Sequence, residues 1–265
     1  MRGSGTIALS AVLVLGACGV AGAANPSPQV SVPGGDFRSV LAPAPGQDVV
    51  RVPGFRLDET PVTNAQFSAF VRAHPEWRRD RVTRLFADPE YLSHWSKADQ
   101  ADAVLADQPV TRVSWFAAGA YCEAQGRRLP TWYEWEYVAA ASETARDARN
   151  DSAWTQRILA WYGKPATAGL PPVGKTPPNM YGARDLHGVV WEWVEDFNSI
   201  LVSGDSREQG DPDVLRFCGT GALTMQDKDN YAILMRIAML SSMEGRYTTT
   251  SMGFRCASDL KSAQP

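Results

Sequence analysis

The chain has 265 residues and a formal charge of -3, and no Lys/Arg cluster interrupts its balanced charge pattern. This composition excludes the basic footprint of a nucleic-acid-binding protein. Only 21% of the residues are charged while nine are tryptophan, which is typical of a well-packed domain. Eighteen prolines and 22 glycines indicate irregular backbone between short elements. We expect one sizeable domain with a single core.

The N-terminus, residues 1–23, has the features of a signal peptide. Arg2 precedes an apolar run at 7–15 that is too short to span a bilayer. The sequence Leu-Gly-Ala-Cys at 15–18 resembles a bacterial lipobox, which would make Cys18 the lipidated first residue of the mature chain. Cleavage after Ala23 is the alternative. Both predict a periplasmic protein, and the lipobox adds a membrane anchor that consists of the N-terminal lipid alone.

The remainder is divided into a linker at 24–30, a domain at 31–258 and a tail at 259–265. Alternating apolar residues predict strands over 30–37 and 49–57. Turns are expected at Gly34-Gly35 and Pro45-Gly46, where the residue types favour chain reversal.

Helix starts are marked by hydroxyl and amide side chains. Thr63 or Asn64 is expected to cap a helix that ends before Pro75, and Ser114 one over 115–124. A third helix begins at Thr131, where Glu134 completes a capping box. We expect Glu134 and Glu136 to have capping and surface roles. Residues 142–153 are polar and predict a solvated loop or short helix.

The segment at 185–193, Asp-Leu-His-Gly-Val-Val-Trp-Glu-Trp, predicts a strand with two buried rings and Glu192 on the other face. One interpretation leaves Glu192 in water. The other places Asp185, Glu192 and the backbone carbonyls of Gly188 and Val190 around a structural calcium ion, which prefers oxygen ligands.

Two further patterns are weaker. The stretch 169–176, Gly-Leu-Pro-Pro-Val-Gly-Lys-Thr, matches the phosphate-binding loop pattern, but Pro171 and Pro172 lack the N–H groups that such a loop needs. We therefore reject nucleotide binding. The three histidines have no metal-ligand spacing, and no Gly-x-Ser-x-Gly elbow supports serine hydrolysis.

Several ordered motifs resemble those of the formylglycine-generating enzyme (sulfatase-modifying factor) family. The resemblance covers about 30–258 and rests on Asp-Glu-Thr-Pro-Val-Thr-Asn at 58–64, Pro-Val-Thr-Arg-Val-Ser-Trp at 109–115, Gly-Arg-Arg-Leu-Pro-Thr at 126–131, the 185–193 segment and Gly-Phe-Arg-Cys at 253–256. It implies the α+β, C-type-lectin-like fold of that family in a single domain with much irregular structure. It also implies a disulfide between Cys122 and Cys256; two buried free thiols are the alternative.

The resemblance does not extend to the catalytic cysteines. Family enzymes use O2 and two cysteines that bind Cu(I), placed shortly after a Gly-Gly-Ser motif. Here that motif is reduced to Cys218-Gly219-Thr220 or Gly219-Thr220-Gly221, and residues 222–237 contain no cysteine. Cys218 alone cannot form a bis-thiolate copper site, so we expect no copper-dependent formylglycine formation. Whether Cys218 is buried or functional stays open.

Three functions are compatible with these motifs. The first is a diverged periplasmic maturation or accessory factor with a protein or peptide partner, similar to the NirV type found with copper nitrite reductases and, less closely, to the PvdO type. The second is a non-catalytic binding protein, such as an immunity lipoprotein against a secreted toxin. The third is an oxidase with a divergent site around Cys218. We favour the first.

Overall fold

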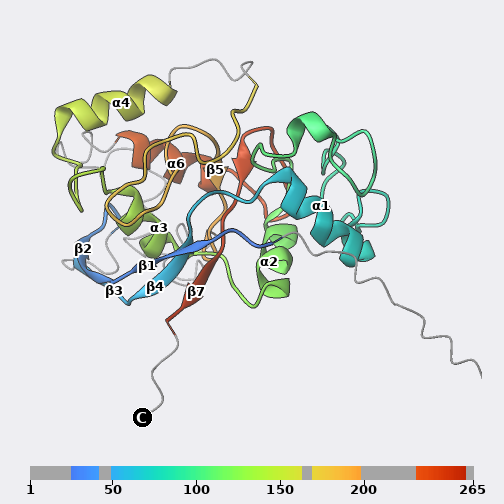
Figure 1. Ribbon diagram of the computed structural model, residues 1–265, viewed down its shortest axis with the longest axis horizontal. Helices are drawn as coiled ribbons and strands as arrows, with labels where there is room; N and C mark the ends of the chain where they lie inside the picture. Colours follow the sequence, from blue (N-terminus) through green and yellow to red (C-terminus); the bar gives the residue numbers. More distant parts are fainter. Residues whose placement is uncertain (1–24, 42–48, 163–168, 198–230, 261–265) are drawn as a thin grey trace, which may run out of the picture.

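The computed structural model describes residues 25–41, 49–162, 169–197 and 231–260, which form three small sheets together with α and 3-10 helices (Figure 1). The strands are β1 (Gln29–Val32), β2 (Gly35–Arg38), β3 (Val49–Val52), β4 (Phe55–Asp58), β5 (Trp191–Glu192), β6 (Met252–Gly253) and β7 (Ala257–Asp259). The helices are α1 (Asn64–Ala73), η1 (Pro75–Trp77), η2 (Ala103–Leu105), α2 (Trp115–Ala124), α3 (Trp132–Ala139), α4 (Ser152–Tyr162) and α6 (Tyr231–Ser241), where η denotes a 3-10 helix. No helix within these ranges is long and apolar enough to cross a membrane.

Segments far apart in the chain form the sheets. The largest has the order β1-β4-β7 with antiparallel pairing, so the last strand lies beside strands from the start of the domain. The strands β2 and β3 form a separate antiparallel pair. The pair β5 and β6 is parallel, with Trp191 opposite Met252 and Glu192 opposite Gly253. This pairing brings the 185–193 and 253–256 motifs together.

The expected strand over 49–57 is two strands in different sheets. Pro53, which has no backbone N–H, and Gly54 separate β3, which pairs with β2, from β4, which pairs with β1 and β7. Gly34 packs against this break with a φ of 70°, and a Cβ there would lie 2.4 Å from the carbonyl oxygen of Val52. Only glycine permits this approach.

The predicted caps of α1, α2 and α3 are confirmed. Thr63 forms a capping box with Gln66, the Ser114 side chain accepts from the amide of Ala117, and Thr131 forms a capping box with Glu134. These contacts satisfy amides that the first helical turn leaves without partners. Helix α4, by contrast, extends nine residues beyond the predicted loop or short helix at 142–153.

The expected surface role of Glu136 is wrong, because its side chain is fully buried. Its carboxylate accepts hydrogen bonds from the Ser39 hydroxyl (2.5 Å), the Val40 amide (2.9 Å) and the Trp132 indole (2.9 Å). Burial raises the pKa of Glu136, and these donors oppose the rise. The residue therefore fastens the segment after β2 to α3.

The core is rich in aromatic side chains and contains a disulfide. Trp95, Trp132, Trp135 and Trp193 are at most 2% exposed. Cys122 of α2 is bonded to Cys256, which directly precedes β7. The bond joins the middle of the domain to its last strand.

Candidate functional site

Glu192 of β5 is fully buried and forms an ion pair with Arg255. The guanidinium binds both carboxylate oxygens, with Nε 2.9 Å from Oε2 and Nη2 2.8 Å from Oε1. The Trp135 indole also donates to Oε2, at 2.8 Å. The interpretation that placed Glu192 in water is therefore wrong. Trp193 is buried as expected, whereas Trp191 is only partly buried.

Arg255 uses all five of its N–H donors in this buried position. Two bind Glu192, and the others are directed to the carbonyl oxygens of Asp58 (3.0 Å), Glu59 (3.1 Å) and Arg184 (2.8 Å). A buried charge with every donor satisfied and an opposite charge in contact is the arrangement that burial requires. Arg255 thereby holds three segments together: the end of β4, the loop before Asp185, and β5.

A second buried arginine, Arg236, contacts both Glu192 and Trp135. Arg236 of α6 is 1% exposed, and its Nη2 donates to the backbone oxygen of Glu192 at 2.5 Å. Its guanidinium carbon lies 3.5 Å from the Trp135 ring centroid. This is a cation–π contact, which gains strength when it is shielded from water. Trp135 therefore contacts a carboxylate through its N–H and a cation through its ring.

Asp185 closes the loop that precedes it. Its carboxylate accepts hydrogen bonds from the amides of Gly174 (2.5 Å) and Thr176 (3.3 Å) and from the Thr176 hydroxyl (2.7 Å). Asp185 has a φ of 60°, a conformation that aspartate and asparagine tolerate better than most residues. Gly174 and Thr176 belong to the sequence that matches the phosphate-binding loop pattern. Their amides thus donate to a carboxylate of the chain itself.

The predicted calcium ligands have separate partners in this arrangement. Asp185 binds the 174–176 loop, and Glu192 faces the positive charge of Arg255, which would repel a cation. In the part of the chain that the structure describes, no cluster of three or more His, Cys, Asp or Glu side chains is placed to hold a metal. Calcium binding stays a prediction, with Asp185, Gly188, Val190 and Glu192 as the ligands. It requires Glu192 to release Arg255 and bind the ion instead.

His187 lies in the loop before Gly188, as expected, but its ring is packed inside the protein. Nε2 is 2.8 Å from the carbonyl oxygen of Ala139. Trp135 and Trp154 are both edge-on to the imidazole, at centroid distances of 5.9 and 5.6 Å. Burial lowers the pKa of His187 to about 4, so the ring is neutral at pH 7.

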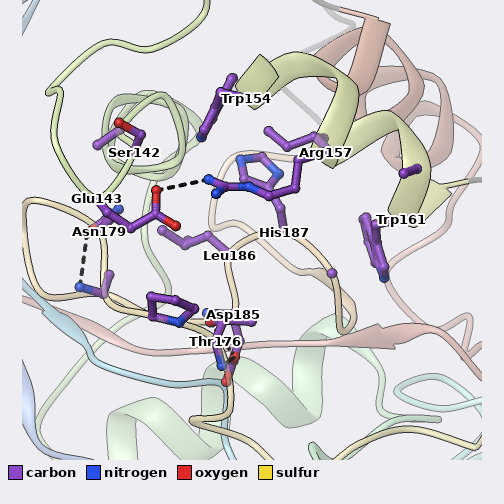
Figure 2. Close-up of a pocket in the computed structure, with 16 residues that line it drawn as sticks. Ser142, Glu143, Trp154, Arg157, Trp161, Thr176, Asn179, Asp185, Leu186 and His187 are labelled. Carbon is purple, nitrogen blue, oxygen red and sulfur yellow. Dashed lines mark hydrogen bonds and ion pairs between the residues drawn. The ribbon is translucent and has the colours of Figure 1, made fainter. Parts of the chain in front are cut away.

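A cavity of about 580 Å³ adjoins this centre, between α4 and the 176–188 segment (Figure 2). Figure 2 shows Trp154, Arg157 and Trp161 extending from α4 toward the loop that carries Asp185 and His187. Its apolar lining includes Ala141, Ile158, Pro177, Ala183 and Leu186. Residues 185–188 line the cavity, and Glu192 of the buried ion pair follows four residues later in the chain.

Several of these features were not predicted from the sequence. The motif that contains Arg255 was noted, but the partner of its arginine was not assigned. Trp154, Ile158 and Trp161 have the spacing of one helical face, which was the available signal for α4. Cys18 and the candidate Cys218 lie outside the described residues.

Comparisons with known proteins agree with these motifs. Residues 20–260 match the family model described as "Sulfatase-modifying factor enzyme 1-like domain". The formylglycine-generating enzyme of Streptomyces coelicolor is 30% identical, over 90% of this chain and 94% of its own. The inactive C-alpha-formylglycine-generating enzyme 2 of Mus musculus is 31% identical, over 65% and 70%. The structure of PvdO from Pseudomonas aeruginosa covers 88% of this chain and 94% of its own, at 19% identity and a TM-score of 0.48. The chain belongs to the sulfatase-modifying factor family, whose members include the formylglycine-generating enzymes.

Proposed function

We propose that this chain is an exported, lipid-anchored family member that acts as a periplasmic maturation or accessory factor, without copper-dependent formylglycine formation. Its partner would be a protein or peptide. The copper nitrite reductase that accompanies the NirV type is the candidate partner that the sequence resemblance offers.

The observation that carries the proposal is the Cys122–Cys256 disulfide. The chain has four cysteines, and this bond removes two of them from any thiolate site. Lipidation would use Cys18. One thiol, Cys218, is then left, whereas the family chemistry depends on a pair of thiolates that hold Cu(I). The donor set in this chain therefore does not fit the copper site.

Two further facts support a role without formylglycine formation. The mouse relative is itself named inactive, so formylglycine formation does not accompany every member of the family. The buried centre described above also uses its charged groups against one another: Glu192 binds Arg255, and Asp185 binds loop amides. Such satisfied groups hold a scaffold and leave recognition to other surfaces.

Co-expression tests the accessory role. A copper nitrite reductase is produced in a bacterial periplasm with or without this chain, purified, and assayed for copper content and nitrite reduction. We expect a higher content and activity when the chain is present. A matched control lacks residues 1–23 and so stays in the cytoplasm. Equal activity in all three preparations would reject this partner.

Intact-mass analysis of the membrane fraction tests the anchor. A diacylated N-terminus at Cys18 is expected, because the lipobox places this cysteine first in the mature chain. A mature chain that begins at Ala24 would contradict lipidation, although it would still be exported.

A further inference from the structure

The cavity beneath α4 has no part in the proposal above, although it has the dimensions of a ligand site. Its volume of about 580 Å³ lies within the range of small-molecule pockets, roughly 300–1,000 Å³. Helix α4 covers it on one side and the 176–188 segment on the other (Figure 2).

Aromatic side chains from one face of α4 form its walls. Trp154 and Trp161 are seven residues apart, which places them two turns apart on the same face. Trp154 packs edge-on against His187. The ring centroids of Trp161 and Trp191 are 6.0 Å apart. Each indole therefore has an aromatic neighbour and also lines the cavity.

The charges in the lining are already compensated. Arg157 forms an ion pair with Glu143 at 2.9 Å, and the Asp185 carboxylate accepts three hydrogen bonds from the 174–176 loop. A charged ligand would find no uncompensated countercharge among these groups. A flat, uncharged ring would instead gain apolar burial and edge or face contacts with the two indoles.

His187 supplies a hydrogen-bond acceptor in the same wall. Its Nε2 is bonded to the Ala139 carbonyl oxygen, whereas Nδ1 is shielded from solvent and has no hydrogen-bond partner in the described part of the chain. A buried acceptor without a donor costs free energy, and a ligand N–H or O–H would remove that cost. Trp154 lines the cavity and stands edge-on at this ring, so a donor reaches the shielded Nδ1 only if the Trp154 indole shifts.

We propose that this cavity binds an uncharged aromatic group with one N–H or O–H donor, an indole or a phenol, between Trp154 and Trp161 and with His187 Nδ1 as the acceptor. The group belongs either to a free small molecule or to a tryptophan or tyrosine side chain of a partner. The inference is independent of the proposed accessory role, because it concerns only the chemistry of the cavity.

Calorimetric titration of the full mature chain tests the proposal. Indole is expected to bind saturably, and 1-methylindole, which lacks the N–H, to bind roughly tenfold more weakly. The peptide Gly-Gly-Trp-Gly-Gly, compared with Gly-Gly-Ala-Gly-Gly, distinguishes the two sources: tighter binding of the tryptophan peptide than of indole indicates a partner side chain. No saturable binding of indole or the tryptophan peptide, or equal affinities for indole and 1-methylindole, would overturn the proposal.

Three variants locate the binding. Trp154→Ala should weaken indole binding roughly fivefold or more through the lost ring contact. Ala160 is exposed and lines the cavity, so Ala160→Trp should obstruct it without removing a wall. Trp77→Ala is the matched control, because Trp77 lines a separate aromatic cavity. Loss of binding in the Trp77 variant, with binding intact in the other two, would overturn the assignment.

Discussion

Replacing Arg255 by methionine should destabilise the protein more than any change to an exposed ion pair. Methionine keeps much of the side-chain volume but removes the charge that Glu192 faces, at a position where both side chains are fully buried. It also leaves the carbonyl oxygens of Asp58, Glu59 and Arg184 without the donors they have now. Breaking a buried pair by removing one partner typically costs about 3–5 kcal/mol. That is a large fraction of a total stability of about 5–15 kcal/mol.

Urea unfolding, followed by tryptophan fluorescence, measures this cost. The matched control is Arg51→Met, because the Arg51–Asp36 pair has side chains that are 77% and 66% exposed. The control should cost less than about 1 kcal/mol. The combined Arg255→Met and Glu192→Gln variant should cost less than the sum of its single changes, because the second change removes the unpaired charge left by the first.

An Arg255→Met cost no larger than that of Arg51→Met would show that the fold does not depend on the Arg255 charge facing Glu192. Glu192 would then have another countercharge, and calcium would be the first to examine.

Non-reducing peptide mapping should recover Cys122 linked to Cys256, and Cys122→Ala should cost about 2–5 kcal/mol, since the bond closes a loop with a sequence separation of 134; a linked peptide containing Cys218 would contradict this pairing. If calcium binds, chelation should lower the melting temperature and Glu192→Ala should remove that sensitivity, whereas an unchanged wild-type melting temperature would reject the ion. Burial lowers the pKa of His94 from 6.5 to about 4, so its contribution to stability is full above about pH 6.5 and is lost as the pH falls toward 4. His94→Gln should reduce the slope of the unfolding free energy against pH in this range. An unchanged slope would show that His94 does not cause the pH dependence.

The features that the sequence predicted correctly are mostly local. The caps at Thr63, Ser114 and Thr131 involve side chains and amides within three residues, so the relevant partners are visible in a short window. The family resemblance supplied the fold class and the cysteine pairing, because its motifs are ordered along nearly the whole domain.

The surroundings of Glu192 and Glu136 depend on distant partners, which is why they were not predicted. Glu192 is 63 positions from Arg255 in the sequence. Glu136 is 97 positions from Ser39, whose hydroxyl donates to its carboxylate. A carboxylate in a strand or helix pattern suggests solvent until such a partner is known. The strand break at Pro53-Gly54 was visible in the residue types, but the switch from one sheet to another depended on β1 and β7. The cavity required the placement of α4 over a loop that follows it in the chain.

The chain has the family fold, and we propose that it lacks the family's copper chemistry. The direct test is incubation of the purified protein with Cu(I), O2 and a Cys-x-Pro-x-Arg peptide, followed by mass spectrometry of the peptide. We predict that the cysteine remains unconverted, because the disulfide and the lipobox leave only Cys218 to bind the metal. Formation of the aldehyde by the wild-type protein, and its loss in Cys218→Ser, would contradict the account and identify Cys218 as the centre of a working oxidase.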